Sequence, residues 1–199
     1  VSALFMRPSN AWCVFIYAHG AGAGMDHEFM EATAHRLAEE GVATFRYNFP
    51  YMERGGWPPD RAPKLIDTVR AAVTGASDLA GGLPLFAGGK SLGGRMTSNA
   101  AALDRLPGVL GLIFLGFPLH NPKKPGVERA VHLDAVDLPM LFLQGTRDKL
   151  AQLDLMEATC DRLGSGILLS IVEGADHGFH VLKRSQRTDD EVLDELVST

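Results

Sequence analysis

The sequence predicts an α/β protein built as a three-layer α/β/α sandwich around a mostly parallel sheet. Short apolar runs alternate with amphipathic ones along the whole chain, which is the pattern of strands connected by covering helices. Four of the short runs are nearly all apolar, as expected of strands buried on both faces. These runs are Cys13–Ala18, Leu83–Ala87, Val109–Leu115 and Pro139–Gln144.

Three weaker runs complete the predicted sheet. Val42–Tyr47 and Ile167–Val172 continue the alternation of strands and helices and are predicted as two more strands. Ala3–Met6 is a candidate edge strand before the first buried run. The segments rich in glycine and proline, Tyr51–Pro63 and Phe117–Gly126, are predicted as loops at strand ends.

Helix signals fill the spaces between these strands. Asp26 is expected to cap a helix that runs to Glu40 and is closed by Gly41. Thr188, followed by Glu191, predicts a capping box for a final helix, and further helices are predicted after Leu92 and after Leu150. Pro63 suits the first turn of another helix. The apolar stripe of that helix is Leu65, Ile66, Val69, Ala72 and Val73.

Size, charge and cysteine content narrow the class of protein. The chain has 199 residues, of which 46% are hydrophobic, so residues 1–199 are predicted to form one globular domain. A net charge of -5 without any run of Lys or Arg argues against nucleic acid and membrane surfaces as partners. Val1–Asn10 lacks the pattern of a secretory signal, and two cysteines are too few for a disulfide framework. We therefore expect a cytoplasmic location.

The segment after the run ending at Ala87 predicts a catalytic serine. Gly89, Ser91 and Gly93 form a G-x-S-x-G motif, and a helix-compatible run follows. A serine on a tight strand-to-helix turn is forced outward, and small residues two before and two after it relieve the crowding. The new helix also directs free amides at the site, so the Leu92 N–H is predicted to be one half of an oxyanion hole.

Two nucleotide-binding alternatives fail on spacing. Gly89-Lys90-Ser91 resembles the end of a phosphate-binding P-loop, but the first glycine of that motif would fall at Pro84, which leaves too few amides to wrap a phosphate. Lys90 is then only a neighbour of the serine. The glycines at 20, 22 and 24 match a dinucleotide loop poorly, because Met25 stands at the third required glycine.

A serine nucleophile requires a base and an acid, and the loops after the later strands supply both. His177 follows the last predicted strand in a flexible loop and is preferred over His180, which lies deeper in the next segment. Asp148 follows the preceding strand and is preferred over Asp154 and Asp176. The order Ser91, Asp148, His177 is the one expected when successive strand ends supply a catalytic triad.

The turn after the first buried strand is predicted to supply the second oxyanion amide. It reads His19-Gly20-Ala21-Gly22-Ala23-Gly24, whose small residues allow a close approach to substrate. The Ala21 N–H is the preferred donor, with Gly22 as the alternative, and His19 is expected to be a structural hydrogen-bonding residue. Five other residues after strand ends either shape a pocket or pack in the loops: Met25, His27, Trp57, Phe117 and Leu119.

Together these motifs make the sequence resemble the α/β-hydrolase superfamily, and within it the dienelactone-hydrolase-like proteins, over nearly its whole length. The resemblance implies the α/β-hydrolase fold and a serine esterase acting on a small-molecule acyl substrate through an acyl-enzyme, without metal or organic cofactor. The sequence departs from that family in two respects. Ser91 occupies the position where dienelactone hydrolases carry cysteine, which puts dienelactone in doubt as substrate. The chain is also short and has no substantial lid domain, which argues against a lipase.

The sequence leaves three questions open. It does not distinguish an ester from a thioester or an amide substrate, and it does not indicate an oligomeric state. It also leaves the alternative of a binding or scaffold protein that keeps this fold without turnover, because fold does not fix function.

Overall fold

A single seven-stranded sheet forms the centre of the structure, a computed structural model that describes residues 1–199. The strand order is β1-β3-β2-β4-β5-β6-β7, and only β1 runs antiparallel to its neighbour. The parallel strands therefore end at one common edge. The strands are β1 (Ala3–Met6), β2 (Cys13–Ala18), β3 (Val42–Tyr47), β4 (Leu85–Lys90), β5 (Val109–Leu115), β6 (Met140–Gly145) and β7 (Ile167–Val172).

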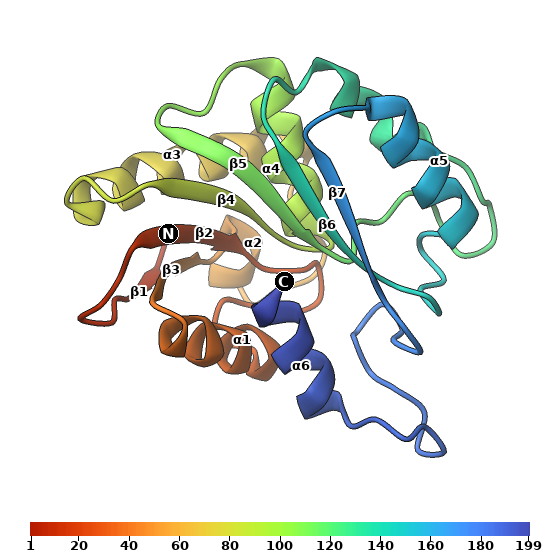
Figure 1. Cartoon of the computed structure of the whole chain (residues 1–199). Helices are drawn as coiled ribbons and strands as arrows, with labels where there is room; N and C mark the ends of the chain where they lie inside the picture. Colours follow the sequence, from red (N-terminus) through yellow and green to blue (C-terminus); the bar gives the residue numbers. More distant parts are fainter.

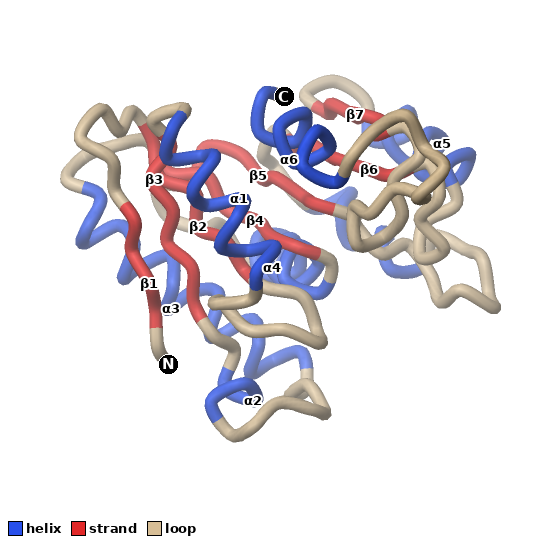
Figure 2. The backbone as a smooth tube through the Cα atoms, turned by 90° about the horizontal axis from the view of Figure 1, so that it is seen from below, coloured by secondary structure: helices blue, strands red, loops and turns tan.

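Helices cover both faces of this sheet, as the predicted three-layer sandwich requires (Figures 1 and 2). Helices α1 (Glu28–Glu39) and α6 (Asp189–Ser198) lie together on one face. The other face carries α3 (Ala62–Ala80), α4 (Leu92–Leu103) and α5 (Leu153–Leu163). The connection from β5 to β6 holds one 3-10 helix, η1 (Glu128–Ala135), so the carboxyl edge of the sheet carries no lid domain.

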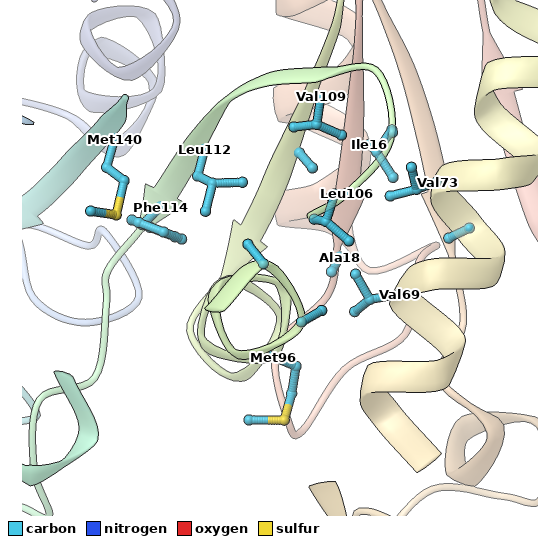
Figure 3. Packing of buried hydrophobic residues seen from close by; sticks show 14 of the residues in the cluster. Ile16, Ala18, Val69, Val73, Met96, Leu106, Val109, Leu112, Phe114 and Met140 are labelled. Atoms are coloured by element: carbon cyan, nitrogen blue, oxygen red, sulfur yellow. The ribbon is translucent and has the colours of Figure 1, made fainter. Parts of the chain in front are cut away.

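Most of the apolar core lies between the sheet and the α3/α4 face. The cluster there contains 33 buried residues, against 10 in the cluster beneath α1 and α6. Figure 3 shows Val69 and Val73 of α3 directed toward Ile16 and Ala18 of β2. The apolar stripe predicted for α3 is therefore confirmed, because its members from Leu65 to Val73 are all buried. Burial of such side chains stabilises the fold by about 1.5–3 kcal/mol each.

Strand β4 differs from its predicted bounds in a way that affects the site. The sequence predicts Leu83–Ala87, whereas the strand begins at Leu85 and continues through Gly88 and Gly89 to Lys90. Glycine disfavours strands, and this is why the prediction stops too early. Here glycine is required, because a Cβ on Gly88 would lie 1.8 Å from the Ile113 carbonyl oxygen of β5. Strand β6 is shifted by one residue in the same direction.

The first helix and two short ones also differ from the sequence prediction. Asp26 is not the N-cap of α1; His27 is, and its Nδ1 accepts a hydrogen bond from the Phe29 amide at 3.2 Å. The helix ends at Glu39 rather than Glu40. Helix α2 (Pro50–Glu53) and η1 arise in segments predicted as loop or left unassigned. Both are too short to show a clear helical period in the sequence.

Two further observations concern the whole chain. Cys13 and Cys160 are both free and buried, and burial raises the pKa of each thiol to about 11. None of the helices combines the length and the apolar character that crossing a membrane requires.

The capping box of α6 is present as predicted and supports a stability prediction. Thr188 Oγ1 accepts from the Glu191 amide at 3.2 Å, and Glu191 accepts from the Thr188 amide at 2.7 Å. Thr188→Ala is expected to lower the free energy of unfolding by about 1 kcal/mol, measured by urea denaturation. Thr74→Ala is the matched control, since Thr74 lies inside α3 and is exposed. Equal losses in the two variants would contradict a capping role.

Candidate active site

Ser91 lies on the sharp turn between β4 and α4. Its φ of 49° is in the left-handed region, which is uncommon for a residue with a side chain and is associated with functional strain. The flanking glycines make this turn possible. A Cβ on Gly89 would lie 2.2 Å from the Ala18 carbonyl oxygen, and a Cβ on Gly93 would lie 2.5 Å from the same atom. The turn therefore packs directly against the end of β2.

A chain of hydrogen bonds joins Ser91, His177 and Asp148. The distance from Ser91 Oγ to His177 Nε2 is 2.8 Å, and that from His177 Nδ1 to Asp148 Oδ2 is 2.7 Å. A carboxylate only accepts hydrogen bonds, so Nδ1 carries the proton and Nε2 is free to accept one from the serine hydroxyl. The structure thus brings together the three side chains that the sequence singled out, from the carboxyl ends of β4, β6 and β7.

The side chain of Asp148 is fully buried and accepts hydrogen bonds at both oxygens. Oδ2 also accepts from Gln144 Nε2 at 2.6 Å, and Oδ1 accepts from the Leu150 amide at 2.7 Å. Burial raises the pKa of Asp148, but the hydrogen bonds and the charge of His177 outweigh burial and leave the pKa below its usual value. The aspartate is therefore ionised at neutral pH and can stabilise a charged imidazole.

The alternatives to His177 and Asp148 have other partners. His180 Nδ1 pairs with Asp189 at 2.7 Å on the surface. Asp176 Oδ1 accepts from the Gly178 and His180 amides and shapes the local turn. Asp154 is exposed in the first turn of α5. None of the three takes part in the hydrogen-bond chain from Ser91.

The loop after β2 lies beside Ser91. A Cβ on Gly20 would come 3.9 Å from Ser91 Cβ. His19 is buried and holds the loop as a structural residue, because its Nε2 accepts from the Phe49 amide at 3.0 Å and its Nδ1 lies 2.7 Å from Gly20 O. Tyr51 adds a second fixation by donating to the carbonyl oxygens of Gly20 and Ala21. These hydrogen bonds anchor the loop backbone next to the serine.

The two amides predicted for the oxyanion hole remain available to a ligand. The Ala21 N–H has no acceptor within the chain. The Leu92 N–H belongs to the first residue of α4, where a helix leaves its amides without intrahelical partners. Leu92 directly follows Ser91 in the chain, and Ala21 follows Gly20, whose backbone lies beside Ser91. An oxygen bearing negative charge could accept from either amide.

A second serine–histidine contact lies elsewhere in the core. Ser98 Oγ is 2.7 Å from His132 Nε2, and Ser98 also donates to Arg95 O at 2.9 Å. Ser98 is fully buried, and no carboxylate hydrogen-bonds to His132. Burial and the charge of Arg95 lower the pKa of His132 to about 4. The pair therefore fastens η1 to α4, and the serine hydroxyl in it is shielded from solvent, unlike that of a serine at a strand end.

Three contributors to the site were missed from the sequence: Gln144, Tyr51 and Lys90. Gln144 is the one polar side chain at the end of an otherwise apolar strand, and that signal could have identified it. Tyr51 lies in a segment that the sequence predicts as a loop, and no sequence motif around it points to a role in the site. Lys90, interpreted as a mere neighbour of the serine, contacts the main chain of His177. Among the pocket candidates, Phe117 and Leu119 are buried core residues, whereas Trp57 is 77% exposed.

Solved structures of similar fold cover almost the whole chain. A serine hydrolase homologue from Coxiella burnetii aligns with a TM-score of 0.79 and 21% identity, over 98% of this chain and 89% of that one. Dienelactone hydrolase from Anabaena variabilis aligns with a TM-score of 0.77 and 20% identity, over 98% and 88%. A serine hydrolase without a lid from Xanthomonas campestris gives 0.73 and 19%, over 98% and 85%.

These similarities agree with the arrangement described above. Three features were found in this chain independently of the comparisons: the strand order, the turn at Ser91 and the absence of a lid domain. In addition, the model of the alpha/beta hydrolase domain family matches residues 11–199. The chain therefore belongs to the α/β hydrolase family.

Proposed function

We propose that the chain is a serine hydrolase that cleaves a small ester or related acyl compound through an acyl-enzyme. The observation that carries this proposal is the hydrogen-bond chain from Ser91 Oγ through His177 to Asp148, with distances of 2.8 and 2.7 Å. Such an arrangement activates a serine hydroxyl, which is otherwise a poor nucleophile near neutral pH. The serine hydrolases of similar fold support the proposal.

The proposed reaction proceeds in two halves at one site. Ser91 Oγ attacks the carbonyl carbon while His177 Nε2 takes the hydroxyl proton, and Asp148 stabilises the resulting imidazolium. The amides of Leu92 and Ala21 hold the oxyanion. His177 then gives its proton to the leaving alcohol as the carbon–oxygen bond breaks. In the second half a water attacks the acyl carbon and loses a proton to His177, and His177 returns that proton to Ser91 Oγ as the bond to the acyl group breaks, which releases the acid and restores the enzyme.

Labelling with a fluorophosphonate tests the proposal directly, because this reagent reacts with activated serines. We expect the wild-type protein to be labelled on the peptide that contains Ser91, identified by mass spectrometry. His177→Ala is expected to abolish labelling, since no base then takes the serine proton. Ser98→Ala is the matched control and should be labelled like the wild type, although Ser98 also contacts a histidine.

The outcome separates two classes of function. Labelling that requires His177 would turn the problem into a screen of short p-nitrophenyl esters, thioesters and amides. A folded wild-type protein that resists labelling would contradict the catalytic proposal. The chain would then be better described as a binding or scaffold protein that retains the fold.

A further inference from the structure

The side chain of Lys90 connects the residue before Ser91 to the loop that carries His177. Its ammonium group donates a hydrogen bond to the main-chain carbonyl oxygen of His177. The main chain of His177 makes no other hydrogen bond. Lys90 therefore provides the one direct polar fixation of the His177 backbone.

An aromatic platform, made of Phe29 and Phe179, supports the ammonium of Lys90. Its Nζ lies 5.0 Å from the ring centroid of Phe179 and 5.8 Å from that of Phe29. The two rings are stacked, with centroids 5.8 Å apart and planes 11° apart. A cation within about 6 Å of an aromatic face is attracted to it. The platform thus holds the charge between α1 and the His177 loop.

The ammonium of Lys90 is more buried than that of the other lysines, and burial disfavours its charged form. The residue is only partly exposed and makes no ion pair, whereas other lysines of the chain are exposed. Burial lowers its pKa to about 8, against the opposing charges of Asp148 and Asp176. Burying a charge without an ion-pair partner is costly, and the hydrogen bond to His177 O and the aromatic platform are the contacts that offset this cost.

A glycine at the end of β5 leaves room for the contact between Lys90 and His177. Gly116, directly after β5, has a φ of +67°. A Cβ at this position would lie 3.2 Å from Lys90 Nζ and 3.5 Å from His177 Nδ1. The ammonium and the imidazole therefore approach the same point beside Gly116. The Lys90 ammonium is therefore near Nδ1, the ring nitrogen of His177 that faces Asp148, and not near Nε2, which faces Ser91.

We propose that Lys90 is a positioning residue, whose ammonium holds the carbonyl of His177 so that Nε2 stays within hydrogen-bond distance of Ser91 Oγ. The inference rests on the proposed function. Lys90 touches no reacting atom and acts through the histidine alone. A displacement of a catalytic group by about 1 Å costs up to about 10²-fold in rate, so loss of this contact should lower kcat and leave KM unchanged.

Lys90→Met tests the proposal, because it keeps the length of the side chain and removes the charge and the donor. We expect kcat for a p-nitrophenyl ester to fall about 10- to 100-fold, with KM within about twofold of the wild type. Lys183→Met is the matched control, since Lys183 is exposed in the same loop, and its kcat should not change. A folded Lys90→Met protein with the kcat of the wild type would overturn the proposal.

A measurement without substrate separates this inference from the proposed function. The proton on His177 Nδ1, hydrogen-bonded to Asp148, should give a low-field NMR signal in the resting wild type that broadens in Lys90→Met. An unchanged signal would overturn the proposal even if the wild type turned over no ester. Failure of all wild-type turnover and labelling would instead refute the hydrolase function.

A second variant covers the case in which Lys90→Met does not fold. Phe179→Leu keeps Lys90 and removes the nearer ring beneath its ammonium. We expect a smaller fall in kcat, about 3- to 10-fold, with KM unchanged and the same broadening of the His177 signal. Wild-type kcat in this variant would count against the aromatic platform and against the proposal that depends on it.

Discussion

Ser91→Ala is expected to lower kcat for p-nitrophenyl acetate by on the order of 10⁴- to 10⁶-fold. The substitution removes the only atom through which the proposed reaction forms its covalent intermediate. The hydrogen bond to His177 is lost at the same time, but the imidazole keeps its bond to Asp148. The fold should persist, which circular dichroism and the urea midpoint would check.

The strained backbone at Ser91 provides a control for this result. Ser91→Gly also removes the hydroxyl, and glycine adopts a φ of 49° without steric cost. We expect the glycine variant to be as inactive as the alanine variant but more stable by about 1 kcal/mol. Retention of more than about 1% of wild-type kcat in both variants would mean that another group is the nucleophile.

The sequence alone predicts that Ser91, Asp148 and His177 lie together, and it does so for one topological reason. In a parallel sheet the carboxyl ends of the strands lie at one edge, so polar residues that closely follow strands β4, β6 and β7 become neighbours. The strand positions follow from long apolar runs, which are strong signals. The site geometry therefore tolerates small errors in strand bounds, such as those at β4 and β6.

Contacts that depend on side-chain packing between distant segments could not be predicted in this way. Lys90 and His177 lie 87 positions apart in the sequence, and the aromatic platform beneath the ammonium joins α1 to a loop. The Tyr51 contact with the loop after β2 depends on the short helix α2. No local period or motif encodes such pairs. Predicting them requires the packing of the assembled layers.

The environment of Asp148 leads to the second prediction with a large expected effect. Asp148→Asn keeps the shape of the side chain but replaces one acceptor oxygen by an NH₂ donor. Both carboxylate oxygens of Asp148 face donors: His177 and Gln144 at Oδ2, and the Leu150 amide at Oδ1. Either orientation of the new amide therefore places a donor against a donor.

One rearrangement relieves this conflict, and it inactivates the histidine. Gln144 Oε1 has no hydrogen-bond partner, so the Gln144 amide can flip and accept from the NH₂ group of the introduced asparagine. The same NH₂ group then faces His177 Nδ1, which can accept only if it carries no proton. The proton moves to Nε2, and the ring donates toward Ser91 Oγ when it should accept. We therefore expect kcat to fall by about 10⁴-fold.

The free energy of unfolding at acid pH gives an independent test of the Asp148→Asn substitution. Because the pKa of Asp148 lies below its unfolded value, its ionisation stabilises the native state above the unfolded pKa of about 3.9. That contribution is lost as the pH falls through the lower, native pKa. In Asp148→Asn this part of the pH dependence should be missing, and urea midpoints measured between pH 7 and pH 3 would show a smaller decline than in the wild type.

Asp154→Asn is the matched control, since Asp154 is the exposed carboxylate at the start of α5. It should keep kcat within about twofold of the wild type, because a surface charge away from hydrogen-bond partners contributes little. If Asp148→Asn and Asp154→Asn gave the same kcat, the hydrogen bond between Asp148 and His177 would be structural only. A loss confined to Asp148→Asn would instead show that the buried carboxylate fixes the imidazole tautomer on which the serine depends.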